Sequence, residues 1–460
     1  MTSKHLNKNL DRRAFLATGT TTGVVLGLGL TAPASARSKA PPTPAPPAHE
    51  LESAKFGLVA NSTKDQTLTL QAALHAAAVV KTSLRLGPGT YIINDLKLPD
   101  YVRLIGSGPA TVLLASQDKP LMASAGASHL SLCDLTLDGT GAAKNILQIS
   151  LCADLKLKSI SARNSTHDAI HLTNCRGVID GCEISNAGTA AIHALQSQGL
   201  TISNNTVLDC KNNGIQVWRN HPGDDASLVA NNRISNIKAS AGGSGQNGNG
   251  INVFRANNVQ VINNHISDCA YSAVRANSAS NIQMVANHCQ RIGEVALYSE
   301  FGFQGALIAN NVVDTAATGI SMTNFSQGGR LGVVQGNLIR NLLRREHEPH
   351  DKRGNGIFVE ADTSVTGNTI EGATSAGIIM GWGANMRDII ASGNLIRNSR
   401  YGILISSNAK NAACSVTNNM ISGAKDGAIM RHEFGRAIDA ELANNTSKIG
   451  NVTVAVNTAV

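Results

Sequence analysis

Residues 204–217 read Asn-Asn-Thr-Val-Leu-Asp-Cys-Lys-Asn-Asn-Gly-Ile-Gln-Val, an Asn pair followed after a short turn by a Gly-Ile-x-Val strand. The unit returns along most of the chain, for example as Asn231-Asn232 with Gly250-Ile251-Asn252-Val253. The apolar residue after each Asn pair, or after its weaker equivalent, falls at positions 137, 160, 184, 207, 234, 266, 289, 313, 339, 370, 396 and 421. Repeats of this length, with short β-branched strands bounded by Gly or Asn, indicate parallel strands wound into a solenoid.

The repeat predicts an all-β protein, a parallel β-helix of about a dozen coils of ~23–26 residues. Successive coils stack about 4.8 Å apart, so that equivalent positions form columns along the axis. The Ile and Val columns then form the core, and the repeated Asn satisfies backbone groups at a turn. Residues 65–80 predict a helix, with Asp65 at its N-cap, that covers the open first coil.

The composition excludes several classes of protein. Aromatic residues make up 3% and charged residues 15% of the 460 residues, and glycine occurs 44 times, which does not fit a helix-rich enzyme core. Beyond the N-terminus no stretch approaches ~18 uninterrupted apolar residues, so a multispan membrane protein is excluded. The net charge of +8 includes no Lys/Arg-rich run, which argues against nucleic acid as a partner and is compatible with an anionic polysaccharide.

The cysteines and acidic residues predict no cofactor. The eight cysteines form no CxxC and no Cys/His pattern with zinc spacing, so we expect them to be small buried core residues. No calcium-binding loop is visible. We therefore expect no cofactor and no metal site; Ca²⁺ is left open as an alternative that no sequence feature supports.

The N-terminal region predicts export. Arg12-Arg13-Ala14-Phe15-Leu16 precedes an apolar run, Ala34-Ser35-Ala36 offers small residues for cleavage, and the arginine pair resembles a twin-arginine signal. We predict a signal peptide over residues 1–36, a Pro-rich linker over 37–57 and one β-helix domain over 58–460. The protein would be bacterial and periplasmic or secreted, with the twin-arginine translocase as partner during export and no stable membrane span after cleavage.

Two sets of motifs resemble known families. Residues 86–92, Leu-Gly-Pro-Gly-Thr-Tyr-Ile, and 102–108, Val-Arg-Leu-Ile-Gly-Ser-Gly, resemble the first coils of pectin-lyase-like right-handed parallel β-helices. Across most of residues 50–450 the chain also resembles an uncharacterised family of twin-arginine-exported bacterial repeat proteins, through the stretches 250–257, 272–281, 293–301, 324–330, 359–362 and 381–383. The resemblance implies a right-handed solenoid and export, and it implies no activity.

The repeat predicts one polar face. The first and third residues after the Gly of Gly-Ile-x-Val point inward, so the second and fourth point outward. The second position gives His171, His193, Gln216 and Asn252, and the fourth gives Trp218, Phe254, Arg275, Tyr298 and Glu360. Such aromatic rings would stack on sugar rings, and Arg219, Arg255 and Arg275 would bind carboxylates. Alternatively, loops cover the rings and the arginines bind backbone carbonyl groups.

Two insertions predict a cleft on this face. Residues 239–248 and 343–354 lengthen two coils between the Asn pair and the Gly-Ile strand, so they project from the same corner about 19 Å apart. The floor between them would hold Arg255, Arg275, Tyr298, Glu300 and Asn324. Glu348-Pro349-His350-Asp351, in the second insertion, is similar to the Asp-Pro-His-Asp/Glu motif of alginate C5-epimerases, but it has Glu in first place and lies in an inserted loop, so we attach no weight to it.

The residues of this face suit a lyase or C5-epimerase acting on a uronate-containing glycan. Such an enzyme needs a base near C5, a cation beside the carboxylate and an acid. We predict catalytic roles for Arg255, Arg275, Tyr298, Glu300 and His193. We predict substrate binding by Trp218, Arg219, Asn252, Phe254, Asn324 and Glu360. The alternative is a non-catalytic solenoid that binds a cell-envelope glycan or serves as a scaffold, so whether the protein is an enzyme stays open.

Overall fold

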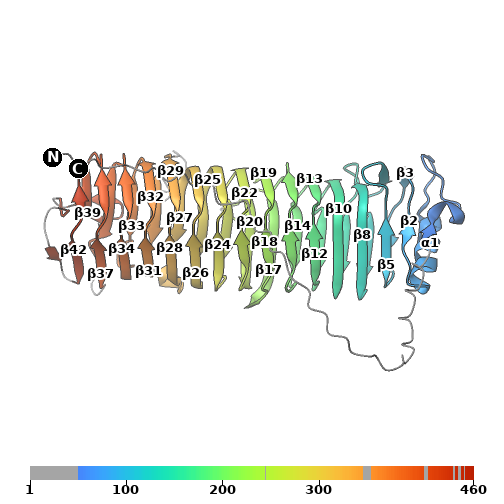
Figure 1. The fold of residues 1–460 in the computed structure, drawn as a ribbon, viewed down its shortest axis with the longest axis horizontal. Helices are drawn as coiled ribbons and strands as arrows, with labels where there is room; N and C mark the ends of the chain where they lie inside the picture. The colour runs from blue at the N-terminus through green and yellow to red at the C-terminus, as the bar shows by residue number, and fades with distance from the viewer. Residues whose placement is uncertain are drawn as a thin grey trace, which may run out of the picture. The chain divides into compact units, whose positions relative to one another are not determined.

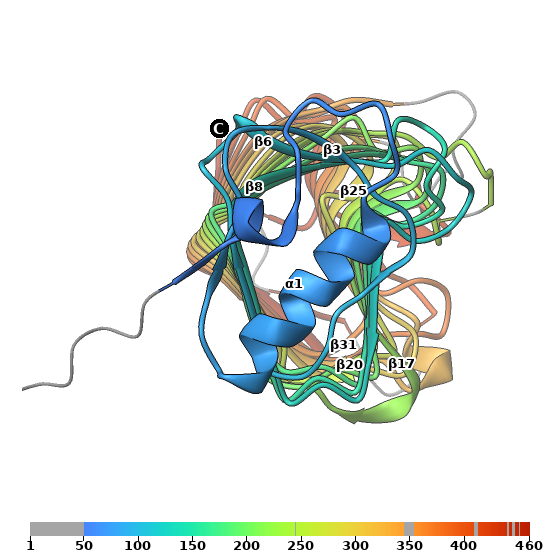
Figure 2. The ribbon, with the colours of Figure 1, turned by 90° about the vertical axis from the view of Figure 1, so that its right-hand side faces the viewer.

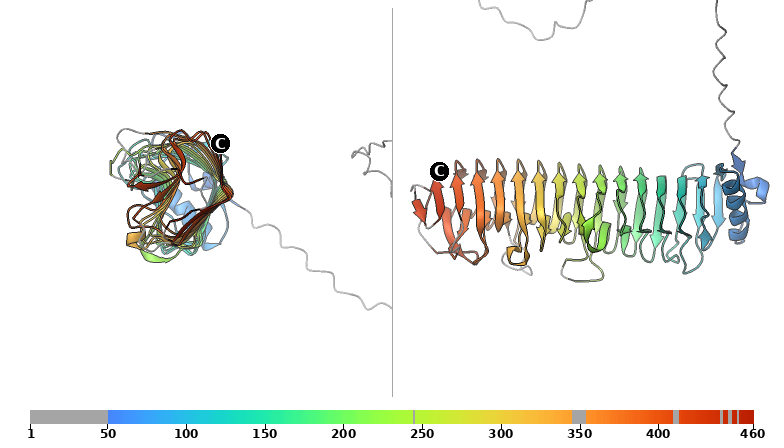
Figure 3. Two further views of the ribbon diagram at one scale, coloured as in Figure 1. Left: turned by 90° about the vertical axis from the view of Figure 1, so that its left-hand side faces the viewer. Right: turned by 90° about the horizontal axis from the view of Figure 1, so that it is seen from below.

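After the first coil, which contributes only one strand, each coil contributes one strand to each of three parallel sheets, and the coils stack in chain order into a right-handed β-solenoid of about 13 turns (Figures 1 and 3). The predicted fold class is confirmed. The computed structural model describes residues 50–243, 245–344, 354–408, 413–438, 441–443, 447–449 and 451–460. The predicted signal peptide and residues 37–49 of the predicted linker lie outside the described residues.

The strands are named here by sheet. Sheet I contains β4 (Leu96–Lys97), β7 (Met122–Ala125), β9 (Leu147–Ser150), β11 (Ile170–Thr173), β14 (Ala190–Leu195), β17 (Asn213–Asp224), β20 (Asn249–Asn257), β23 (Val274–Asn277), the C-terminal parts of β25 (His288–Glu300) and β27 (Val312–Met322), β30 (Asn355–Val359), β33 (Ala376–Met380), β36 (Tyr401–Ser406) and β39 (Gly427–Glu433). Sheet II contains β1 (Leu51–Glu52), β2 (Leu84–Arg85), β5 (Val102–Ile105), the N-terminal parts of β8 (His129–Asp138) and β10 (Asp154–Ser165), β12 (Gly177–Asp180), β15 (Thr201–Ser203), β18 (Leu228–Ala230), β21 (Gln260–Ile262), β24 (Ile282–Val285), β26 (Gln304–Ala309), β28 (Arg330–Gln335), β31 (Ala361–Thr366), β34 (Arg387–Ser392), β37 (Cys414–Thr417) and β42 (Val452–Ala455). Sheet III contains β3 (Gly89–Ile92), β6 (Thr111–Leu114), the remaining parts of β8, β10, β25 and β27, and β13 (Glu183–Ala187), β16 (Thr206–Leu208), β19 (Arg233–Ile237), β22 (His265–Cys269), β29 (Leu338–Leu342), β32 (Thr369–Ala373), β35 (Leu395–Arg397), β38 (Met420–Ser422) and β43 (Thr458–Ala459). Two further strands, β40 (Arg436–Ala437) and β41 (Ser447–Ile449), pair antiparallel with β39 and β42.

The inward side chains of the three sheets form one continuous hydrophobic core. In sheet I, Ile192 pairs with Ile215, which pairs with Ile251, and all three are fully buried. Along β11, Ile170 and Leu172 point inward and are buried, whereas His171 and Thr173 are only partly buried. The period-2 pattern therefore reports the inward faces correctly in these coils.

A ladder of asparagines occupies the corner between sheets II and III. Asn287 shows its bonding pattern: Nδ2 donates to Oδ1 of Asn311 at 3.1 Å and to the carbonyl of Val261 at 2.9 Å, and the backbone N–H of Asn287 donates to the same Asn311 Oδ1 at 2.8 Å. The ladder contains Asn205, Asn232, Asn264, Asn287, Asn311, Asn337, Asn368, Asn394, Asn419 and Asn457. The predicted structural role of the repeated Asn is confirmed.

Helix α1 (Thr67–Val79) lies across the open end of the first coils, as Figure 2 shows. The predicted covering helix is confirmed, with Gln66 rather than Asp65 at the N-cap. Asp65 still satisfies the first turn, because its Oδ1 accepts a hydrogen bond from the Thr67 N–H at 2.8 Å. None of the helices in the described parts of the chain is both long and apolar enough to cross a membrane.

The solenoid begins before residue 58, earlier than the sequence predicted. Strand β1 pairs in parallel with β2, and the short helix η1 (Ser53–Phe56) follows it. Residues 51–57 therefore belong to the first coil and not to the linker. A strand of two residues is too short to be found from hydrophobic periodicity.

The eight cysteines are unpaired, as the sequence predicted. Seven are buried and Cys133 is partly buried. Burial raises the pKa of the Cys182 thiol to about 11 and that of Cys175 above its ordinary value. These thiols therefore serve as small core side chains.

Candidate functional site

Sheet I carries two outward columns of side chains that hold most of the predicted site residues. Column 1 contains His171, His193, Gln216, Asn252, Arg275, Tyr298 and Ser321. Column 2 contains Thr173, Leu195, Trp218, Phe254, Asn277 and Glu300. The two columns run side by side along the solenoid axis.

Arg275 and Tyr298 lie in column 1, although the sequence placed them beside Trp218 and Phe254 in column 2. The predicted register is wrong by two residues in these coils, because Val274 pairs with Ile251, the first inward residue of the neighbouring strand. The second inward position of that coil holds the small Ala276 in place of a β-branched residue. The hydrophobic pattern therefore did not mark this position.

An aromatic stripe, His171, His193, Trp218 and Phe254, crosses consecutive coils of sheet I. Its ring centroids lie 4.9, 5.3 and 5.7 Å apart in order, and each contact is edge to face. The Arg255 guanidinium lies 4.6 Å from the centre of the Phe254 ring. All five side chains are only partly buried, so the stripe presents rings and a cation to solvent.

Arg219 and Arg255 follow column 2 at the end of the stripe. The pairing of β17 with β20 shifts between Trp218 and Gly223, so residues 219–222 bulge from the sheet, and β17 stands out beyond its neighbours in Figure 2. Arg255 Nη1 donates to the Asn220 carbonyl at 2.6 Å, and Arg219 Nη1 donates to the Ser197 carbonyl at 3.4 Å. The predicted alternative, arginine bound to carbonyl groups, is thus confirmed for one nitrogen of each guanidinium.

Asp168 organises the two histidines of the stripe. Its Oδ2 accepts hydrogen bonds from Nδ1 of His171 at 2.9 Å and of His193 at 3.1 Å. Its Oδ1 accepts from the Ala190 N–H at 3.1 Å and from the Thr189 hydroxyl. Burial alone would raise the pKa of Asp168, but the hydrogen bonds from the imidazoles hold it well below its ordinary value. The ionised carboxylate therefore fixes the orientation of both rings.

The same three side chains could hold a metal ion. Their ligand atoms all lie within 4.8 Å of one another. The sequence predicted no metal site, because Cys/His spacing does not reveal an aspartate and two histidines that come together only across coils.

Arg275, Tyr298 and Glu300 form a buried cluster. They are 7%, 5% and 2% exposed, so the expectation that they line the floor of an open cleft is wrong. Arg275 binds Glu300 in bidentate fashion, with Nε to Oε1 at 2.6 Å and Nη2 to Oε2 at 2.9 Å, and its Nη1 lies 3.4 Å from Glu294 Oε2. Asn277 Nδ2 also donates to Glu300, at 2.9 Å. The charged groups therefore satisfy one another.

The pKa values in this cluster are shifted by burial and by charge. Burial alone would lower the pKa of Arg275, but the carboxylates of Glu300 and Glu294 raise it above its ordinary value. Burial raises the pKa of the Tyr298 phenol well above its ordinary value, so the hydroxyl keeps its proton at neutral pH. The catalytic roles of Arg275, Tyr298 and Glu300 stay a prediction, which requires the cluster to open.

The first insertion reaches this cluster through Gly245 and Gln246, whereas its residues 241–243 are exposed. The Gln246 carbonyl accepts a hydrogen bond from Asn252 Nδ2 at 3.2 Å. A Cβ atom on Gly245 would lie 1.6 Å from Arg275 Nη1, so only glycine, here with φ of 125°, allows this approach. The insertion therefore excludes solvent from Arg275 and fixes Asn252, which is 4% exposed.

The two insertions leave the solenoid at the same corner, as predicted. Ile251 and Ile357, which follow them, belong to one inward column of sheet I. Residues 345–353, which include the Glu348–Asp351 motif, lie outside the described residues.

Asn324 and Glu360 hold a short helix against the end of column 2. Glu360 Oε2 accepts a hydrogen bond from the Phe325 N–H at 2.7 Å, at the start of η2 (Phe325–Gln327). Asn324 Oδ1 accepts from the Phe301 N–H at 3.3 Å. These contacts are structural, and the substrate-binding role of both residues stays a prediction.

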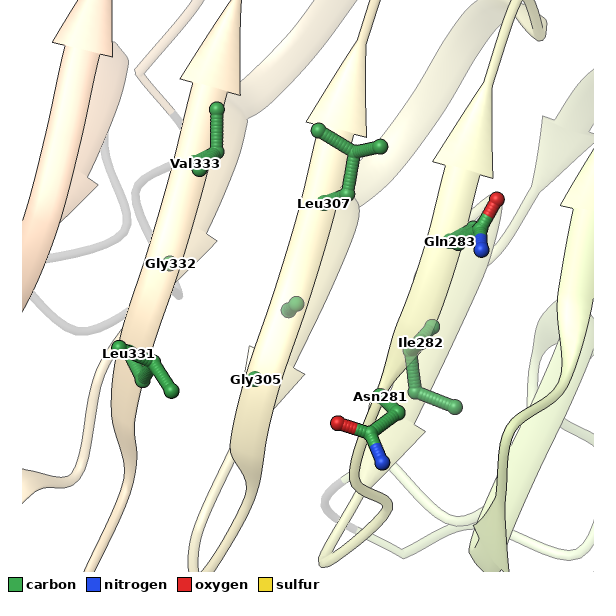
Figure 4. Close-up of a pocket in the computed structure, with 9 residues that line it drawn as sticks. Asn281, Ile282, Gln283, Gly305, Leu307, Leu331, Gly332 and Val333 are labelled. Carbon is green, nitrogen blue, oxygen red and sulfur yellow. The ribbon is translucent and has the colours of Figure 1, made fainter.

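A shallow groove of about 340 Å³ lies on sheet II, away from columns 1 and 2. Figure 4 shows Leu307 and Leu331 at this groove, with Gly305 and Gly332 leaving space between them. No predicted site residue lines it. The candidate site is therefore the aromatic stripe of sheet I with Asp168, Arg219 and Arg255.

Comparison with known proteins supports the fold. A family model described as a right-handed beta helix region matches residues 145–240, and no curated protein sequence matches the chain. Among solved structures, the N-terminal fragment of bacteriophage phi29 gene product 12 is similar over 89% of this chain and 70% of its own, with 15% identity and a TM-score of 0.50. The pre-mature form of that gene product is similar over 83% of this chain and 54% of its own, with 16% identity and a TM-score of 0.52. The A-module of mannuronan C-5 epimerase AlgE6 of Azotobacter vinelandii covers 89% of this chain and 99% of its own, with 15% identity and a TM-score of 0.48.

Proposed function

We propose that this protein is exported and binds an acidic polysaccharide along the aromatic stripe of sheet I. The observation that carries the proposal is the stripe itself, in which His171, His193, Trp218 and Phe254 contact one another in sequence and stay partly exposed. Three steps of about 4.8 Å make it roughly 14 Å long, which suits a chain of sugars better than a single one. The twin-arginine-like signal over residues 1–36 supports export.

The charge at the stripe supports an acidic ligand. Arg219 and Arg255 follow column 2 directly, and a guanidinium that stacks on an aromatic ring is well placed to bind a carboxylate carried by a stacked sugar. Removal of the predicted signal peptide takes away Lys4, Lys8, Arg12, Arg13 and Asp11, a net +3, and the remaining charge of +5 (8 − 3) supports the same sign of partner. A neutral glycan would offer these guanidinium groups no anionic partner beyond the backbone carbonyl groups that each already binds through Nη1.

Trp218→Ala is expected to weaken binding of the acidic polysaccharide at least about tenfold, because it removes the central ring of the stripe and with it about 1.5–3 kcal/mol of apolar contact. The measurement is a calorimetric titration of the purified chain with alginate, pectate and glucuronan. Tyr101→Ala is a matched control, since Tyr101 is 38% exposed and contacts His129 and Lys81 beside sheet II. If both variants bind like the wild type, the stripe is not the binding site.

A second candidate function is a lyase or C5-epimerase acting on the bound uronate. The observation that favours it is Asp168, which accepts the Nδ1 protons of His171 and His193 and so leaves the lone pair on each Nε2. His171 would take the C5 proton through Nε2, because the Nε2 of His193 is buried, while Arg219 or Arg255 neutralises the carboxylate. Of the predicted catalytic residues, His193 and Arg255 are the ones at this place.

Replacing both histidines, His171→Ala with His193→Ala, is expected to abolish turnover while the stripe still binds glycan through Trp218 and Phe254. Elimination is measured as the absorbance at about 235 nm of the unsaturated uronate, and epimerisation by analysis of the sugar product. If the wild type binds glycan but yields neither the unsaturated uronate nor an epimerised sugar, the enzymatic function is contradicted and the binding function stands.

A further inference from the structure

The cluster of Asp168, His171 and His193 is built like a metal site. Both imidazoles turn Nδ1 toward one carboxylate oxygen, Asp168 Oδ2, at 2.9 and 3.1 Å. The histidines come from equivalent positions of neighbouring strands, β11 and β14, and the aspartate comes from the turn before β11. Two imidazoles and a carboxylate on one side of an ion are a common ligand set for zinc and other divalent transition metals.

We propose that Asp168 Oδ2 and the Nδ1 atoms of His171 and His193 bind a divalent transition metal ion, with Zn²⁺ as the best fit. Zinc bonds of about 2.0–2.2 Å in tetrahedral geometry place ligand atoms about 3.3 Å apart. The two separations from Asp168 Oδ2, 2.9 and 3.1 Å, would need to grow only slightly, and the three ligand atoms all lie within 4.8 Å of one another. Three protein ligands leave one position of a tetrahedral ion open.

The surroundings support a bound ion. Asp168 Oδ1 is held by the Ala190 N–H and the Thr189 hydroxyl, which leaves Oδ2 directed at the imidazoles. The Nε2 of His171 lies 3.4 Å from the Thr173 hydroxyl, which can accept an N–H from a ring that binds metal through Nδ1. The Asp168 side chain is 10% exposed, so the carboxylate is shielded from water.

The tautomer of His193 is free to change. Its Nε2 is buried and has no hydrogen-bond partner among the described residues, so no donor on that side holds the proton on Nδ1, and with metal on Nδ1 the Nε2–H would need an ordered water as acceptor. An ion would replace the Nδ1 protons of both rings, and each ring would then carry its proton on Nε2. The metal-bound protein could not use these histidines as bases, so the ion and the second candidate function exclude each other.

The ion would also complete the binding site at one end of the stripe. Its open position would take water or, where the proposed glycan binding holds, a carboxylate oxygen of the sugar chain. Only this last step rests on the proposed function, because binding of the ion itself needs no glycan.

A second histidine pair offers an internal comparison. His265 and His288 stack in neighbouring coils with Nδ1 atoms 3.0 Å apart, and among the described residues neither has a carboxylate partner of the kind that Asp168 provides. We expect no tight metal binding there. This pair controls for ordinary binding of metal by surface histidines.

The proposal is tested by calorimetric titration of the metal-stripped full chain, prepared without a histidine tag, with ZnCl₂ and no glycan. We expect one tight Zn²⁺ per chain. Asp168→Ala and, separately, His171→Gln should each weaken it by about 100-fold or more, since loss of an outer-shell partner alone typically costs 10–100-fold. His288→Ala should bind like the wild type.

The outcomes separate cleanly. Tight Zn²⁺ binding by the wild type and by His288→Ala, with weakened binding by Asp168→Ala and His171→Gln and unchanged circular dichroism in all variants, establishes the site. Absence of tight binding by the wild type, or binding that Asp168→Ala and His171→Gln leave unchanged, overturns the proposal. If Asp168→Ala fails to fold, His171→Gln decides, because its side chain is 26% exposed and its loss disturbs the core least.

Discussion

Asn287→Ala is expected to lower the free energy of unfolding by at least about 3 kcal/mol. The substitution leaves the backbone N–H and Nδ2 of Asn264 without the acceptor they share and leaves the Val261 carbonyl without its donor. It also removes one of the two donors to Asn311 Oδ1. Each buried polar group left unpaired costs about 1–3 kcal/mol; the Asn264 N–H and the Val261 carbonyl each lose their bond to Asn287, and Asn264 Nδ2 keeps only its bond to the Val229 carbonyl. Urea unfolding followed by circular dichroism measures the loss.

The control for this prediction is an asparagine outside the ladder. Asn220 is exposed on the bulge of β17, and Asn220→Ala should fall within the scatter of surface substitutions. Asn287→Asp keeps the shape but lacks the amide donors and buries a charge, so it should destabilise at least as much as Asn287→Ala. If the Asn287 and Asn220 variants unfold at the same urea concentration, the ladder adds no stability.

Arg275→Ala is expected to destabilise the solenoid by about 3–5 kcal/mol, because it strands the carboxylates of Glu300 and Glu294 in the interior without their cation. The matched control is Arg291, which binds Asp268 with the same bidentate geometry at 2.6 Å but on the surface, at 51% and 42% side-chain exposure. Arg291→Ala should have a far smaller effect, since water replaces the lost partner. The measurement is again the unfolding free energy.

A double-mutant cycle identifies the cause. Arg275→Ala and Glu300→Ala should cost less together than the sum of the two single changes, because the pair variant no longer holds Glu300 unpaired. If the losses of unfolding free energy in the two single variants simply add, the loss comes from packing beneath the first insertion and not from the ion pair. A loss as small as that of Arg291→Ala would mean that the cluster is open to water in solution.

Much of the fold was predictable because a solenoid repeats its information. The spacing of the Asn pairs predicted the coils, and the ladder around Asn287 explains why that residue type recurs. Asp65 and the apolar residues after it predicted α1. These features depend on local sequence or on one column of equivalent residues, and both can be read from the chain.

The site was harder to predict, because it depends on the pairing register of the strands and on which loops cover the outward side chains. In the coil of Arg275, the inward position equivalent to Val253 holds Ala276. The register predicted from the hydrophobic pattern was therefore wrong by two residues. Burial of Arg275 depends on Gly245, whose loop folds back over it, and insertion length alone does not give that direction. A polar column can be predicted from repeats, but not what lies on top of it.

Asp168 was missed although a signal was present. His171 and His193 occupy one predicted column, and two stacked imidazoles at sheet spacing call for a nearby anion or ion. A search for acidic residues within a few positions of either histidine would have found Asp168. Glu294 was missed because it lies before the predicted strand and reaches Arg275 only through the corrected register.

The eight unpaired cysteines make the order of folding and oxidation important. Each thiol is shielded only once its own coil has its neighbours, so a chain threaded through a membrane unfolded would present all eight to an oxidising compartment together. Wrong disulfides between coils would then compete with stacking, and strands cross-linked out of register could not close the core. A chain that completes its solenoid in a reducing compartment avoids this competition, because seven of its eight thiols are already buried, and the pKa values of thiols such as Cys182 and Cys210 are raised when they meet the oxidant. Transport in the folded state would thus protect the register of this protein as well as deliver it.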